Sequence, residues 1–164
     1  MLTKAERMSF QFPLNYHLFL AKDISVFGTI SMKKIEHIGV AVVDIEKAEK
    51  IFSTIFQQAP YKSEEVVSES VHTTFFRVGE SKLELLSATN NNSPIAKFLS
   101  KNKEGMHHIA FAVEDIEKEM QRLANEGIRL LNESPKEGAD NKLICFLHPK
   151  DTYGVLIELC QEKT

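Results

Sequence analysis

The sequence predicts an α+β fold in which two tandem βαβββ modules form one curved mixed sheet around a cleft. Three observations predict it: an internal repeat, a helix signal in each copy of the repeat, and strand-like segments after each helix. Residues 37–47 (HIGVAVVDIEK) match residues 108–118 (HIAFAVEDIEK) at eight of eleven positions. Self-similarity of this kind indicates one supersecondary unit used twice.

Each copy opens with a run that is typical of a buried strand, at residues 35–43 and 106–113. Asp44 and Asp115 follow as N-caps of amphipathic helices, and Gly127 is placed to end the second helix. The remaining strands of the first module are expected at residues 61–68, 71–78 and 82–87, and those of the second at 128–132, 143–147 and 154–160. Each copy therefore predicts the order β-α-β-β-β.

The two modules are expected to form a single domain over residues 32–162. Module 1 covers about residues 33–89 and module 2 about residues 105–161, joined by a short helical linker at 90–104. In this linker, Ser93 caps a helix that begins at Pro94, where the missing N–H of proline has no cost. Residues 1–31 do not follow the pattern, so they are expected to be an N-terminal extension or the product of a start site assigned too early.

Composition excludes several classes of protein. Twenty Lys and Arg against 23 Asp and Glu give a formal charge of −3, without the basic surplus of a general nucleic-acid binder. No apolar run approaches the roughly 18–20 residues that a membrane-spanning helix needs. Cys145 and Cys160 do not make a disulfide framework, which favours a reducing compartment. We expect a cytoplasmic location, or the mitochondrial matrix for a eukaryotic source.

Two histidines and two glutamates occupy matched positions in the repeat. His37 and His108 lie in the first strand of each copy, and Glu84 and Glu158 lie in the last strand, 47 and 50 residues further on. A carboxylate buried alone among Leu and Ile would cost several kcal/mol. A divalent cation removes this cost, and two imidazoles with two carboxylates suit Zn²⁺, Co²⁺, Mn²⁺ or Ni²⁺. The alternative is that both histidines are ordinary core residues and both glutamates lie on exposed strand faces. The matched pairs favour a metal-binding cleft instead.

Other side chains are weaker candidates. Strand alternation places His107 on the face opposite to His108, which predicts a structural role. Cys160 shares the face of Glu158, where a small buried filler is favoured over a thiolate ligand. Lys150 lies in a turn where it could meet an anionic substrate or be simply solvated. The sequence lacks phosphate-binding, dithiol, zincin and nucleophile-elbow motifs, which argues against those enzyme classes.

With these residues in place, the chain resembles the vicinal oxygen chelate superfamily, which includes glyoxalases, bleomycin-resistance proteins and dioxygenases. Within it, the sequence is most similar to the methylmalonyl-CoA epimerase family. The stretches that carry the resemblance are EHIGVAV at 36–42, SPIAKFL at 93–99, GMHHIAF at 105–111, FLHPKD at 146–151 and GVLIEL at 154–159. The resemblance covers about residues 33–162.

The resemblance implies an isomerase that inverts C2 of methylmalonyl-CoA by metal-assisted proton transfer through an enolate. Its metal ligands fall on His37, Glu84, His108 and Glu158, which implies one divalent ion per chain (Co, Zn, Mn or Ni). Glu158 is also implied as an acid/base group. It further implies an acyl-CoA substrate and a homodimer, with no nucleic-acid or membrane partner.

The second acid/base group departs from the family pattern. A glutamate of some relatives aligns with Thr73, whose hydroxyl cannot replace a carboxylate near neutral pH. Another group, a water or a nearby carboxylate such as Glu69 is then expected to take this role.

Three alternative functions remain open from the sequence. A glyoxalase I-like lyase would use similar ligands on a hemithioacetal. A metal-free binding module like the bleomycin-resistance proteins would generally lack the full ligand set. An extradiol dioxygenase would more often use two His and one Glu with iron.

Overall fold

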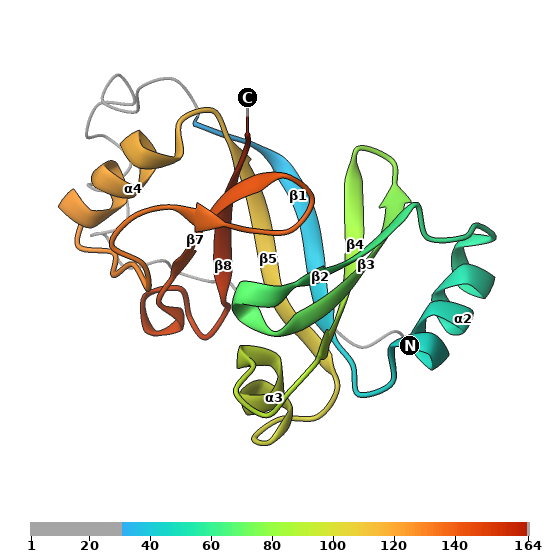
Figure 1. Cartoon of the computed structure of the whole chain (residues 1–164). Helices are drawn as coiled ribbons and strands as arrows, with labels where there is room; N and C mark the ends of the chain where they lie inside the picture. The colour runs from blue at the N-terminus through green and yellow to red at the C-terminus, as the bar shows by residue number, and fades with distance from the viewer. Residues whose placement is uncertain (1–30, 164) are drawn as a thin grey trace, which may run out of the picture. The chain divides into compact units, whose positions relative to one another are not determined.

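The computed structural model describes residues 31–163, which form one eight-stranded mixed sheet with the order β2-β3-β4-β1-β5-β8-β7-β6 (Figure 1). The elements of the first module are β1 (Met32–Ala41), α2 (Ile45–Phe56), β2 (Lys62–Val66), the 3₁₀ turn η2 (Val67–Glu69), β3 (Val71–Val78) and β4 (Ser81–Ala88). Helix α3 (Pro94–Leu99) connects them to β5 (Gly105–Val113), α4 (Ile116–Asn125), β6 (Lys136–Glu137), β7 (Lys142–Leu147), η3 (Pro149–Asp151) and β8 (Ile157–Glu162).

The sheet order repeats about its centre. Strands β1 and β5 pair antiparallel in the middle, and each pairs in parallel with the last strand of its own module, β4 or β8. The outer strands then follow in the same sequence on each side. This pseudo-twofold arrangement confirms the predicted α+β fold of paired βαβββ units.

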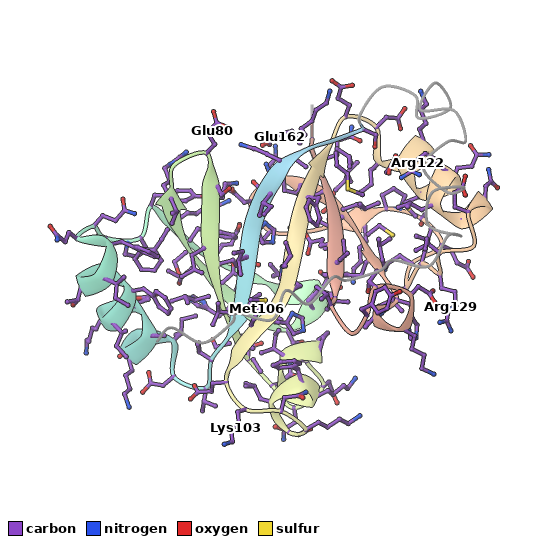
Figure 2. The ribbon with its side chains drawn as sticks, turned by 180° about the vertical axis from the view of Figure 1, so that it is seen from behind. Glu80, Lys103, Met106, Arg122, Arg129 and Glu162 are labelled. Carbon is purple, nitrogen blue, oxygen red and sulfur yellow. The ribbon has the colours of Figure 1, made fainter. Side chains whose placement is uncertain are left out.

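Strand alternation divides the sheet residues between a helix-covered core and a cavity. Phe76 and Leu85 pack with α2, whereas their neighbours Phe75 and Glu84 line the cavity. In the second module, Leu159 packs against α4 and Glu158 lines the cavity. Seen from behind, β1 and β5 run between α2 and α4 (Figure 2). Burial of each large apolar side chain contributes about 1.5–3 kcal/mol, so the two helix-covered cores hold the sheet curved around the cavity.

The predicted helix caps are confirmed. The carboxylate of Asp44 accepts a hydrogen bond from the Lys47 N–H at 2.9 Å, and that of Asp115 accepts from the Lys118 N–H at 3.0 Å. The Ser93 hydroxyl accepts from the Ile95 N–H at 3.1 Å and starts α3. These bonds satisfy N–H groups that have no partner inside the first turn of a helix.

Two predicted strands differ in the structure. Residues 128–132 make only an isolated bridge, because the Asn132 side chain accepts from the Phe146 N–H at 3.1 Å in place of a backbone carbonyl, and Pro135 has no N–H. The edge strand of this module is instead the short β6. The last strand begins at residue 157 rather than 154, because Tyr153 and Gly154 have φ values of 53° and 86°.

The expected N-terminal extension falls on residues 1–30, which lie outside the described part of the chain, and on Ser31. Within residues 31–163, no helix has both the length and the apolar character that crossing a bilayer requires.

Candidate metal centre and active-site cavity

The four matched side chains meet at one point inside the sheet. His37 from β1 and His108 from β5 approach with their Nε2 atoms 2.8 Å apart. An oxygen of Glu84 lies 3.3 Å from Nε2 of His37 and 3.4 Å from Nε2 of His108. The corresponding distances to Glu158 are 3.8 and 3.5 Å. None of the four residues is more than 6% exposed, so the structure brings together the whole ligand set predicted from the sequence.

Strand register explains why these side chains meet. In the parallel pairs, Glu84 lies level with Gly39, and Glu158 lies level with Ala110. Each small residue is two positions after the histidine of its own module, on the same face of its strand. In the antiparallel pair, Gly39 faces His108 and Ala110 faces the other histidine. Each small residue is therefore flanked by one carboxylate and one imidazole.

The charges around this point favour a cation. Among residues 31–163, neither Glu84 nor Glu158 forms an ion pair with a lysine or arginine. Burial raises the pKa of Glu158. Burial also acts to raise the pKa of Glu84, but the imidazoles of His37 and His108 outweigh it and the net direction is down. Burial would lower the pKa of His37, but the surrounding carboxylates, Glu84 foremost, raise it to about 9.

The donor atoms also have the spacing that a metal ion needs. Ligands about 2.0–2.2 Å from one ion lie about 3.3–3.6 Å apart in a tetrahedral arrangement. The contacts that the two imidazoles make here range from 2.8 to 3.8 Å, and donor atoms of His37, His108 and Glu158 all lie within 4.8 Å of one another. Two Nε2 lone pairs at 2.8 Å would repel each other unless a proton or a cation lies between them. Two imidazoles and two carboxylates therefore form a donor set that fits a divalent cation.

Comparison with known proteins agrees with this geometry. Residues 36–146 match the model of the glyoxalase/bleomycin resistance protein/dioxygenase superfamily. The chain belongs to this superfamily. Similar members include the human mitochondrial methylmalonyl-CoA epimerase, which is 39% identical over 138 residues that cover 83% of this chain and 78% of the relative.

Similar solved structures also include methylmalonyl-CoA epimerases. A variant of the Streptomyces coelicolor methylmalonyl-CoA epimerase, in complex with 2-nitronate-propionyl-CoA, aligns with a TM-score of 0.79 and 32% identity over 82% of this chain and all of that one. A methylmalonyl-CoA epimerase in complex with methylmalonyl-CoA and NH4⁺ aligns with a TM-score of 0.78 and 32% identity over 82% of this chain and 97% of that one.

In this superfamily member, a β-bulge precedes the histidine of β1. Ile35 pairs with Phe111 and His37 pairs with Ala110, which leaves Glu36 as the extra residue. A bulge redirects a side chain that alternation would send to the other face. The Glu36 carboxylate therefore reaches the ring of His37, with Oε2 2.5 Å from Nδ1. No role for Glu36 was predicted from the sequence.

A second bulge precedes the histidine of β5 and corrects the prediction for His107. Gly39 pairs with His108 and Val40 pairs with Met106, so His107 is the extra residue. Its ring does not point to the opposite face, as strict alternation predicted, but lines the same cavity, with Nδ1 2.9 Å from Nδ1 of His108. Burial, with help from the neighbouring imidazole, lowers the pKa of His107 to about 4.

The Glu36 carboxylate is held by two lysines. It forms ion pairs with Lys82 and, at 3.4 Å, with Lys142. Lys82 also reaches Asp140 at 2.7 Å, in the turn between β6 and β7. Burial opposes ionisation of Glu36, but the hydrogen bonds from His37 and Lys82 keep its pKa well below the usual range. The network therefore favours an ionised carboxylate beside the ring of His37.

The whole cavity has a volume of about 280 Å³, and its surface is mostly apolar. Phe75, Leu86 and Phe146 contribute to its walls. Glu69 from η2 lines it, and its carboxylate pairs with Lys136 of the other module at 2.6 Å. The position of Lys136 gave no signal in the sequence.

The remaining candidates fall into different places. Thr73 lines the cavity, 1% exposed, with its hydroxyl 3.5 Å from the Glu64 carbonyl. Cys160 packs in an apolar cluster with Ile144, which agrees with the predicted role of a small buried side chain. Its sulfur also lies within 4.8 Å of donor atoms of Glu36 and His37. Lys150 lies in η3 and does not line the cavity.

Proposed function

We propose that this chain is a methylmalonyl-CoA epimerase, which interconverts the R and S forms of methylmalonyl-CoA by moving a proton at C2. The observation that carries the proposal is the convergence of two buried imidazoles and two buried carboxylates on one apolar cavity. The superfamily membership, and the epimerases that this chain resembles over about four-fifths of its length, support the same reaction and substrate.

We propose that His37, Glu84, His108 and Glu158 hold one divalent ion per chain. Co²⁺, Zn²⁺, Mn²⁺ and Ni²⁺ are all compatible with this donor set. When bound, such an ion supplies Lewis-acid stabilisation of the negative charge that develops on the thioester oxygen as the C2 proton leaves.

Glu158 is proposed as one acid/base group at C2. Its carboxylate lines the cavity beside the proposed ion, and it serves as a base provided that coordination leaves one oxygen free to accept the proton.

Glu69 is proposed as the second acid/base group, because the Thr73 hydroxyl cannot hold or release a proton near neutral pH. Glu69 lines the same cavity, and its ion pair with Lys136 orients the carboxylate there. A water in the same cavity is the alternative proton carrier, and the two differ in their response to substitution of Glu69.

Deuterium uptake from D₂O at C2 of methylmalonyl-CoA tests the proposal, with methylglyoxal plus glutathione as a parallel substrate. We expect uptake with the acyl-CoA alone, and a loss of about 10²–10⁴-fold in Glu158→Gln. A comparable loss in Glu69→Gln supports the second acid/base assignment, whereas an unchanged rate there assigns that role to water. Turnover of the glutathione adduct alone would contradict the epimerase function and favour a lyase.

We further propose that the chain acts in the cytoplasm, or in the mitochondrial matrix of a eukaryote, and that it forms a homodimer. Light scattering of the purified protein tests the dimer. Lys150, outside the cavity, is proposed to contact the CoA portion of the substrate, and a raised KM of Lys150→Ala at unchanged kcat tests this role.

A further inference from the structure

The two bulges that directly precede His37 and His108 are equivalent in the repeat. Glu36 and His107 are each the residue directly before a histidine of the candidate centre, and the central register between the bulges is regular from His37 to Gly39. A bulge is a specific structural feature rather than a defect, and it often re-aims a side chain next to a functional site. Here the same insertion is made twice, at the same position of each module.

Each bulge delivers a hydrogen-bonding group to the same atom of the next residue. Glu36 Oε2 lies 2.5 Å from Nδ1 of His37, and Nδ1 of His107 lies 2.9 Å from Nδ1 of His108. The two Nε2 atoms, on the other side of each ring, lie 2.8 Å apart and point into the shared centre. The rings of His37 and His108 are thus each contacted at Nδ1, by two different residue types in equivalent positions of the repeat.

We propose that Glu36 and His107 are positioning residues, which fix the tautomer and orientation of the two histidines of the centre. This inference rests on the proposed metal site. An imidazole that binds a metal through Nε2 carries its proton on Nδ1, and this N–H needs an acceptor. The carboxylate of Glu36 accepts from His37, and the unprotonated Nδ1 of His107 accepts from His108.

The two acceptors differ in strength. Glu36 is an anion anchored by Lys82 and Lys142, and a charge-assisted hydrogen bond raises the basicity of the ligand that donates it. His107 is a neutral acceptor, and its ring packs nearly perpendicular to that of Phe98, with centroids 4.9 Å apart. Loss of the Glu36 charge should therefore weaken metal binding more than loss of the His107 nitrogen.

Titration of the metal-free protein with Co²⁺, followed by its visible absorption, measures the effect directly. We expect Glu36→Gln, which keeps the shape but removes the charge, to weaken Co²⁺ binding about 10–100-fold. His107→Phe keeps the ring and should weaken binding near the lower end of that range. Glu65→Gln and His72→Phe are the matched controls, because Glu65 is exposed and His72 bonds to the Ser63 hydroxyl rather than to the centre.

A second readout separates positioning from a general loss of packing. The Co²⁺-loaded protein should show two exchangeable, hyperfine-shifted proton resonances, one from each Nδ1–H. Glu36→Gln should shift one of them, and His107→Phe should increase the solvent exchange of the other. If Glu36→Gln does not fold, as judged by circular dichroism without metal, the His107→Phe variant decides.

Two folded variants with wild-type affinity and unchanged proton resonances would overturn the inference. Failure of the wild-type protein to bind Co²⁺ would instead overturn the proposed metal centre itself, so the two failures are distinct.

Discussion

Gly39→Ala should disable the candidate centre through a single methyl group. A Cβ added at Gly39 would lie 2.2 Å from Cε1 and 2.5 Å from Nδ1 of His108. Carbon atoms in contact lie about 3.5–4.0 Å apart, so the ring would have to withdraw by more than about 1 Å. Metal-ligand distances tolerate only about 0.2 Å, and a misplacement of about 1 Å in an active site can cost about 10²-fold in rate.

The assay compares Co²⁺ affinity, epimerisation rate and stability in urea for this variant. We expect a loss of at least about 10²-fold in rate and a lower metal affinity, with about 1–3 kcal/mol lost from the free energy of unfolding by overpacking. Gly138→Ala is the matched control, because its Cβ would lie 2.6 Å from Cγ2 of Ile144, which costs packing but does not displace a side chain of the candidate centre. Wild-type affinity and rate in Gly39→Ala would refute the placement of the His108 ring.

Three further outcomes are expected. Asp115→Ala should lower the free energy of unfolding by about 1 kcal/mol, measured in urea, because it removes the acceptor for the Lys118 N–H at the start of α4; an unchanged value would contradict the cap. Burial and the hydrogen bond to Asp140 raise the pKa of Tyr61 to about 12. The neutral Tyr61 hydroxyl therefore stabilises the fold below about pH 10, and this contribution is lost as the pH rises through 12. Ultraviolet titration should show a phenolate step near pH 12 that Tyr61→Phe removes. Burial raises the pKa of Cys145 to about 11, so this thiol should resist a disulfide reagent at pH 8 until the protein is denatured, and rapid labelling of the native protein would contradict its burial.

The repeat in the sequence was sufficient to predict the fold and the convergence of the four matched side chains. Equivalent positions in paired modules are related by a shared axis, and the antiparallel pairing of β1 with β5 at the centre of the sheet brings His37 and His108 close to that axis. The helix caps were predictable because Asp44 and Asp115 act within four residues of the chain. Features that depend on neighbouring residues or on the repeat can therefore be predicted from the sequence.

The bulges could not be predicted, because each depends on pairing across strands rather than on the local sequence. Strict alternation sends Glu36 and His107 to the back of the sheet, and neither residue is a glycine or proline that would mark an irregularity. One signal was available, since a polar residue stands before the histidine in both copies. The Lys136–Glu69 pair, 67 residues apart, carries no comparable pattern.

The small residues beneath the centre extend the prediction for Gly39. Gly39 and Ala110 are equivalent in the repeat, and each faces the histidine of the other module. The structure already accommodates the methyl of Ala110, whereas a methyl at Gly39 would overlap the His108 ring, so His108 lies closer to β1 than its counterpart lies to β5. The space made by Ala110→Gly would therefore open beside His37 and not beside the displaced ring of His108. We expect the double variant Gly39→Ala, Ala110→Gly to bind Co²⁺ as poorly as Gly39→Ala alone, and recovery of the affinity would show that the two rings can exchange their positions.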